Sequence, residues 1–175
     1  MTIPDYDIGR LVGGDMDSVR KAYTNFKEQE IDQVILKEGP YPYPMNKTTI
    51  VGTEKVSGRG TFSNNTNSTL VFSPGKDDGW WINRTDLGEQ FPFKVSIRNV
   101  WTTARNIVLR CGNPHNYLRM VEHIIALKVG MAVDNMLIST ETGDPPLFER
   151  GNLDLVEAVL KSGITETKEP AKFIT

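Results

Sequence analysis

Five short β-prone segments follow one another between residues 45 and 110, and this pattern constrains the fold more than any other feature of the sequence. The segments are rich in β-branched and aromatic residues and cover residues 48–51, 68–72, 80–83, 93–100 and 105–109. Clusters of Gly, Asn, Pro and Asp separate them, notably at 58–68 and 74–79, which predicts strands joined by polar turns. We therefore expect antiparallel pairing in this part of the chain.

Two helical segments with a strand between them follow the β-prone region. The first helix is predicted over about 116–129, ending at Gly130, and the strand over 132–140. The second helix is expected to begin after a cap at Asn152 and to end before Gly163. The sheet-facing side of the first helix is predicted to carry Leu118, Val121, Ile125 and Lys128. Strands followed by helices predict an α+β fold, a two-layer sandwich of a mainly antiparallel sheet with two helices on one face.

An N-terminal helical arm and a Pro-rich linker are predicted for residues 1–44, ahead of a single α+β domain at 45–175. Val19, Tyr23 and Phe26 share one side of the arm's helix, and the linker closes with the sequence KEGPYPYP at 37–44. The apolar side of this helix packs on its own domain, on a partner or on a second copy of the chain. At the other end, residues 172–174 are β-prone and predict the start of a further strand.

The composition argues against several classes of protein. Twenty Lys and Arg balance 22 Asp and Glu, for a net charge of -2, so we expect no nucleic-acid partner. No apolar stretch approaches the roughly 20 residues of a transmembrane segment, and no signal peptide is recognisable. The single cysteine, Cys111, agrees with a cytoplasmic location. With Cys111, His115 and His123 as the only nitrogen or sulfur donors of this kind, a self-contained zinc site would be unusual.

One side of the first predicted helix carries side chains that can do chemistry. Arg119, Glu122, His123 and Ala126 follow the spacing i, i+3, i+4 and i+7. An imidazole can ligate zinc, and a neighbouring carboxylate can take a proton from a water molecule. By spacing alone, a solvated polar face explains the same residues.

A resemblance to a known family gives this helix a more specific interpretation. The run 121–127 (VEHIIAL), with Gly130 and the Val-Asp-Asn of 133–135, resembles the Val-Glu-His helix and the Asp-Asn strand of UDP-3-O-acyl-N-acetylglucosamine deacetylase, the zinc enzyme of lipid A biosynthesis. Upstream, the segments 58–60, 69–74 and 83–87 occur in the family's order and spacing. The resemblance covers roughly residues 46–174, which is the first domain of that family.

The resemblance implies roles for two residues and the need for a second half. In the family, zinc lies between two similar domains; Glu122 corresponds to the general base and His123 to one zinc ligand. The family's other zinc ligands belong to a His-Lys-x-x-Asp motif of the second domain, which is absent here. The sequence also departs from the family at Thr61-Phe62, where a histidine is expected, at Met120 in place of Thr, and near 148–152.

The leading hypothesis is therefore half of a zinc-dependent deacetylase that is inactive alone. Its Zn²⁺ would need ligands from a second domain or chain, and its substrate would be a UDP-linked acylated amino sugar. The partner would be a second polypeptide carrying the missing domain, or another copy bound through the N-terminal arm. Two alternatives stay open: a non-catalytic relative that acts as a binding or interaction module, and the first domain of a longer enzyme.

Overall fold

The computed structural model describes residues 14–28, 44, 46–63, 66–88, 91–146 and 150–171. The chain divides into two units, Met1–Tyr41 and Pro42–Thr175. In the first unit, α1 (Met16–Lys27) is the expected arm helix. Asp15 caps it, because its carboxylate accepts a hydrogen bond of 2.8 Å from the Ser18 backbone N–H. That hydrogen bond lowers the pKa of Asp15. The predicted linker at 37–44 lies almost entirely outside the described residues, as does the side chain of Phe26.

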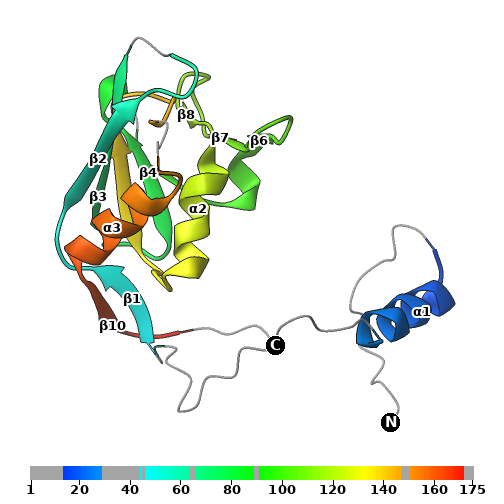
Figure 1. Ribbon diagram of the computed structural model, residues 1–175. Coiled ribbons are helices and arrows are strands. Elements are labelled where there is room, and N and C mark those ends of the chain that lie inside the picture. The colour runs from blue at the N-terminus through cyan, green and yellow to red at the C-terminus, as the bar shows by residue number, and fades with distance from the viewer. Residues whose placement is uncertain are drawn as a thin grey trace. The chain divides into compact units, whose positions relative to one another are not determined.

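The second unit is built around a five-stranded sheet (Figure 1). In spatial order its strands are β2 (Glu54–Arg59), β3 (Asn67–Pro74), β9 (Met136–Thr140), β4 (Trp80–Arg84) and β5 (Phe93–Lys94). Neighbouring strands are antiparallel except β4 and β9, which are parallel. A short 3-10 turn, η1 (Thr85–Leu87), follows β4. The mainly antiparallel sheet agrees with the sequence prediction.

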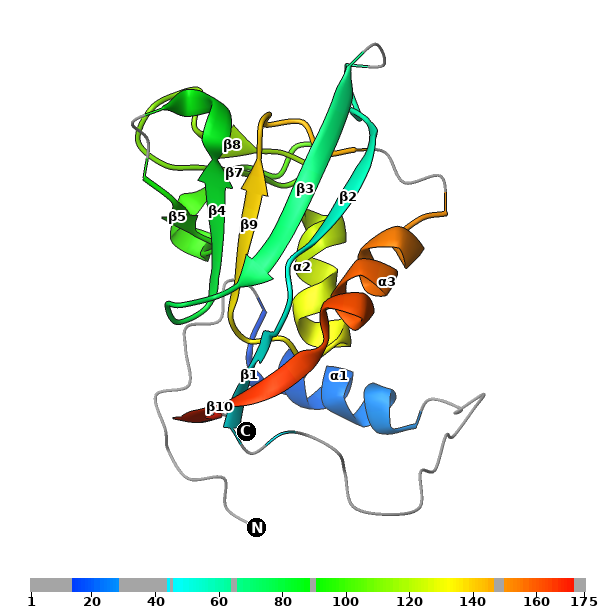
Figure 2. The same cartoon turned by 90° about the vertical axis from the view of Figure 1, so that its left-hand side faces the viewer.

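Two helices, α2 (Val121–Gly130) and α3 (Leu153–Ser162), lie together on one face of this sheet (Figure 2). The core between the layers combines inward-facing strand residues such as Phe72, Trp80 and Ile138 with helix residues such as Leu127 and Leu155, all at most 3% exposed. Full burial of each such side chain stabilises the fold by about 1.5–3 kcal/mol. The protein is therefore the two-layer α+β sandwich that the order of elements predicts.

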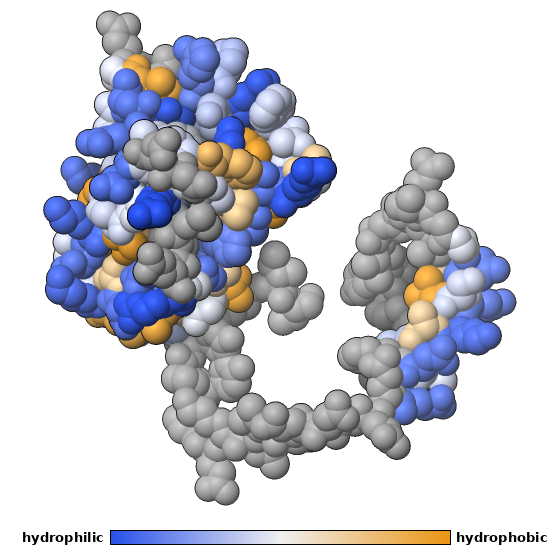
Figure 3. Space-filling model, turned by 45° about the horizontal axis from the view of Figure 1, so that its top comes forward, coloured by the Kyte–Doolittle hydropathy of each residue, from blue (hydrophilic) through white to orange (hydrophobic). Residues whose placement is uncertain are grey.

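Two smaller sheets complete the domain. β1 (Asn46–Ile50) pairs with β10 (Ile164–Pro170), and β6 (Val100–Thr102), β7 (Val108–Arg110) and β8 (Tyr117–Leu118) form an antiparallel three-stranded sheet. The C-terminal strand thus precedes the predicted position, and residues 172–174 lie outside the described part. In the view of Figure 3, apolar side chains on the surface of this unit are interspersed with polar ones.

The strand predicted at 93–100 is wrong in its middle. β5 ends at Lys94, a 3-10 turn follows as η2 (Ile97–Asn99), and β6 begins at Val100. Side chains divert the backbone here: the Ser96 hydroxyl accepts from Arg98 N–H, and the Asn99 amide donates to Lys94 O at 2.7 Å. Such local hydrogen bonds compete with strand pairing. The strand β2 was not predicted, because part of it lies in the segment interpreted as a polar turn.

The first helix of the layer begins five residues later than predicted. Residues 117–118 pair with β7 as β8, and Met120, with φ of 54°, turns the chain into α2. The fully buried side chains of α2 are Val121, Ile124 and Leu127. Of the predicted set, Leu118 is buried in β8, whereas Ile125 and Lys128 are only half-buried. The Lys128 ammonium donates to Asp134 O at 2.6 Å, and its burial lowers its pKa.

The two adjacent tryptophans occupy opposite faces of the sheet, as the alternation of a strand predicts. Trp80 is 1% exposed in the core and donates from its indole N–H to Val133 O at 2.8 Å. Trp81 lies on the other face and is half-buried. Among the described helices, none is long and apolar enough to cross a membrane.

Candidate active site

Glu122 and His123 occupy the first turn of α2 and are held differently. The Glu122 carboxylate is half-buried and accepts a 2.9 Å hydrogen bond from the Ile107 backbone N–H, just before β7. A carboxylate in the first turn of a helix is also favoured by the helix dipole. The His123 side chain is exposed and forms no hydrogen bond with another described residue. Consecutive helix residues point about 100° apart, which explains the different surroundings.

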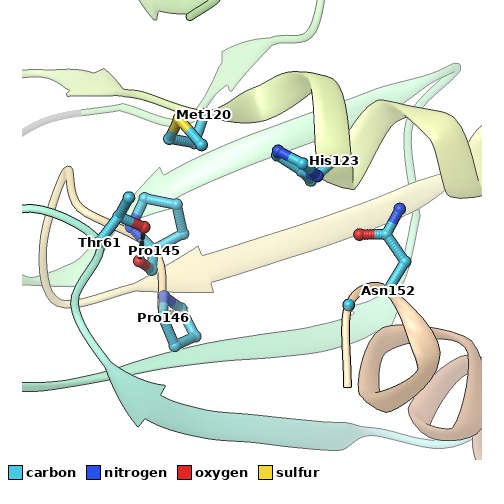
Figure 4. A pocket seen from close by; sticks show the side chains of 7 residues that line it. Thr61, Met120, His123, Pro145, Pro146 and Asn152 are labelled. Carbon is cyan, nitrogen blue, oxygen red and sulfur yellow. Dashed lines mark hydrogen bonds between the residues drawn. The ribbon is translucent and has the colours of Figure 1, made fainter. Parts of the chain in front are cut away.

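His123 lines a small pocket of about 90 Å³ (Figure 4). His123 from α2 and Asn152 from the start of α3 approach it from one side, and Thr61, Pro145 and Pro146 border the other. The complete lining is Thr61, Met120, His123, Pro145, Pro146, Gly151 and Asn152. Most of this wall is apolar, with the imidazole as its one titratable group. Glu122 does not line the pocket, so the site that both residues would share lies at the pocket's edge.

A buried aspartate fixes the wall opposite His123. The Asp144 carboxylate accepts hydrogen bonds from the Phe62 and Ser63 backbone N–H groups at 2.8 and 3.0 Å. Thr61 adds two bonds to Pro145 O, from its N–H at 3.1 Å and its hydroxyl at 2.8 Å. At Gly60, a Cβ atom would lie only 2.8 Å from the Asp144 carboxylate, so a larger residue there would displace this carboxylate from its position. Sequence reasoning missed Asp144, whose only signal was its place in a Gly-Asp-Pro-Pro turn.

The sequence departures from the family converge on this pocket. Thr61, Met120 and Asn152 are far apart in the chain, yet all three line the pocket beside His123. Residues 147–149, which include part of the third departure, lie outside the described residues. The pocket is therefore where the expected departures from the family pattern would change the chemistry.

Arg84 could bind an anionic ligand because it is an arginine, but its guanidinium is already hydrogen-bonded within the fold. It is nearly buried, and it donates to the Asp86 carboxylate at 2.8 and 2.7 Å and to the backbone oxygens of His115 and Tyr117 at 2.8 and 2.7 Å. This guanidinium holds the pKa of Asp86 below its usual value. Bidentate pairing of this kind fixes geometry and leaves little capacity for a ligand.

Among the residues that the structure describes, no group of three or more His, Cys, Asp and Glu side chains is placed to hold a metal ion. Cys111 and His115 are both exposed, and neither lines the pocket. A catalytic zinc needs about three protein ligands. The described residues therefore offer one zinc ligand at this pocket, the His123 imidazole, and not a complete zinc site.

Comparison with known proteins identifies relatives of this chain. A family model described as UDP-3-O-acyl N-acetylglycosamine deacetylase matches residues 47–175. The UDP-3-O-acyl-N-acetylglucosamine deacetylase of Bdellovibrio bacteriovorus is 30% identical over 106 residues, 60% of this chain and 34% of that protein. The protein of the same name from Psychrobacter cryohalolentis is 29% identical over 131 residues, 74% of this chain and 40% of that protein.

A third relative is the bifunctional enzyme LpxC/FabZ of Chlorobaculum tepidum, 26% identical over 107 residues, which are 61% of this chain and 22% of that protein. In all three cases the matched part is well under half of the relative. The chain thus spans less than half the length of the curated relatives that it matches.

Proposed function

Because the chain belongs to the UDP-3-O-acyl N-acetylglycosamine deacetylase family, we propose that it supplies one half of a zinc-dependent amide hydrolase of lipid A biosynthesis. The observation that carries the proposal is the position of Glu122 and His123. They begin one helix at the edge of a pocket, with the imidazole exposed and the carboxylate fixed by a backbone N–H. The substrate would be a UDP-linked acylated amino sugar.

The two residues have separate roles in this proposal. His123 would hold Zn²⁺ together with ligands from a second domain or chain, and the bound ion would polarise the amide carbonyl. Glu122 would accept a proton from the attacking water and later deliver it to the leaving amine. One of its oxygens is tied to Ile107, so the other is oriented and makes no hydrogen bond with a described residue.

Three observations support the need for a second half: the greater length of the relatives, the missing zinc ligands and the exposed apolar surface of the helices. The aligned portions are 34%, 22% and 40% of the lengths of the matched relatives. On the outward side of the helices, Val129 and Leu160 are 82% and 62% exposed. Apolar surface of this kind, next to small Ala126, suits contact with a further protein layer. A second polypeptide is our first choice of partner, and a second copy bound through the arm is the alternative.

The test combines this chain with a separately produced second domain and measures release of acetate from the UDP-sugar. We expect no turnover from either part alone and turnover from the mixture. Glu122→Gln should lower kcat about 10²–10⁴-fold with zinc content unchanged, because it removes the base and keeps the shape. His123→Ala should reduce the zinc retained after dialysis.

His115→Ala is the matched control, since His115 is exposed but does not line the pocket. It should change neither kcat nor zinc content. Full activity of the Glu122→Gln mixture would refute the role of the base, and turnover by the chain alone would refute the split site.

A second candidate function is a non-catalytic binding module. It is favoured by the Glu122–Ile107 hydrogen bond, which is also what a purely structural carboxylate would form. Native mass spectrometry of the protein purified without chelator separates the two. A stoichiometric second chain with one zinc supports the enzyme, and a metal-free single species supports the module.

A further inference from the structure

The Arg119 guanidinium lies close to two aromatic rings beside the pocket. Its guanidinium carbon lies 4.5 Å from the centre of the Phe62 ring and 5.4 Å from that of Tyr117. Its backbone N–H donates to Gly143 O at 3.0 Å, and Asp144 fixes the turn that carries Phe62. The side chain is therefore oriented before any ligand arrives.

The hydrogen-bonding capacity of this guanidinium is unused within the described part of the chain. Its Nε is buried and has no acceptor there, and the group forms no salt bridge with a described carboxylate. Arg84 also lies near the Tyr117 ring, 5.5 Å from its centre, but its guanidinium makes four hydrogen bonds. A buried donor without an acceptor costs about 1–3 kcal/mol, so an acceptor from outside the described chain that reaches the buried Nε–H of Arg119 would be stabilising.

The charges of the sequence segment that contains Arg119 favour a negatively charged acceptor. From residue 90 to residue 121 the sequence contains no Asp or Glu. The same stretch contains five permanently basic residues, Lys94, Arg98, Arg105, Arg110 and Arg119. An anion that approaches Arg119 thus meets no opposing carboxylate from this segment.

We propose that Arg119 binds an oxyanion, a phosphate or a carboxylate, at the rim of the pocket. A planar guanidinium donates two parallel hydrogen bonds to either group. Phe62 and Arg119 are the chain neighbours of Thr61 and Met120, which line the pocket with His123, so the oxyanion would lie next to a molecule bound there. Assigning the oxyanion to the substrate's diphosphate or to the released carboxylate rests on the proposed function, whereas oxyanion binding itself does not.

Arginine Nε–H resonances followed by NMR test the proposal on the whole chain, with inorganic pyrophosphate and acetate as separate probes. We expect the Arg119 signal to shift saturably with at least one probe. A response to pyrophosphate assigns a phosphate source, and a response to acetate alone assigns a carboxylate source. Arg119→Met should weaken binding at least tenfold, and Arg119→Lys should weaken it less, because it keeps the charge but loses the fork.

Arg110→Met is the matched control, because Arg110 also stacks on an aromatic ring, 4.6 Å from the centre of Trp101. It should leave the affinity unchanged. Equal, non-saturating shifts of Arg110 and Arg119, or full affinity in Arg119→Met, would overturn the inference. If Arg119→Met does not fold, the wild-type Arg119 signal decides alone. Oxyanion binding without deacetylation in the two-part assay would refute only the proposed function. Deacetylation without oxyanion binding at Arg119 would refute only this inference.

Discussion

The two sides of α2 differ in burial: one is packed in the core and the other is exposed. Toward the sheet, Val121, Ile124 and Leu127 are at most 3% exposed and fill the core. On the opposite side, His123 and Ala126 are exposed and Val129 is 82% exposed. Packing alone explains the residues of the first side. Nothing in the described fold of the chain requires those of the second, so their identities are better explained by chemistry or by a partner.

The strongest test of this contrast is a pair of truncations on α2. Leu127→Ala should lower the free energy of unfolding by about 2–5 kcal/mol, because it leaves a cavity in the core. Val129→Ala should change it by less than about 0.5 kcal/mol. Urea unfolding followed by circular dichroism measures both. Similar losses in the two variants would show that the outward side is also packed within the chain.

A second pair of variants applies the contrast between packed and unpaired side chains to Arg84 and Arg119, which both lie near the Tyr117 ring. Arg84→Met should cost about 1–3 kcal/mol, because it removes the buried donor of the His115 and Tyr117 backbone oxygens and leaves the partly exposed Asp86 unpaired. Arg119→Met should cost less than about 1 kcal/mol, the value of its aromatic contacts. The same unfolding assay checks them. A larger loss in Arg119→Met would indicate that Arg119 is structural.

The smallest expected effect on stability concerns an ion pair at the surface. Like the outward side of α2, it should contribute little to the free energy of unfolding. Lys47 donates a hydrogen bond to Asp78 at 2.5 Å and, together with Lys94 at 3.1 Å, lowers the pKa of that carboxyl from 3.8 to about 2. The folded-state pKa is depressed, so this contribution is present above about pH 4 and is lost as the pH falls towards 2. It should be small, because the Asp78 side chain is 62% exposed to screening solvent.

Unfolding curves between pH 2 and pH 5 measure this contribution. Asp78→Asn should flatten part of the acid dependence and leave stability at pH 7 slightly reduced. An unchanged acid dependence would assign the loss of stability to other carboxylates, such as Asp86.

The sequence predicted the fold class and most strand positions, because alternating β-branched runs and turn residues are local signals. It failed where side chains redirect the backbone, as at Ser96 and Asn99, and where two residues of β8 continued an apparent helical spacing. The positive φ of Met120, which separates β8 from α2, has no signal in residue type.

The candidate site was predictable only in part. Glu122 and His123 were identified through the family motif, and their roles stay predictions. The pocket itself could not be predicted, because Thr61, Met120 and Asn152 come together only through tertiary contacts. Asp144 was missed because its two backbone partners lie more than 80 residues away in the chain.

The hydrogen bond between Ile107 N–H and the Glu122 carboxylate also makes this backbone amide a reporter. Anything that engages the carboxylate through the same oxygen, whether a proton, a water or a ligand, competes with the amide for it. Hydrogen–deuterium exchange at Ile107 should then speed up when the carboxylate is engaged, even in a chain that turns over no substrate. The occupancy of this one side chain can thus be followed on a backbone position that lies outside α2.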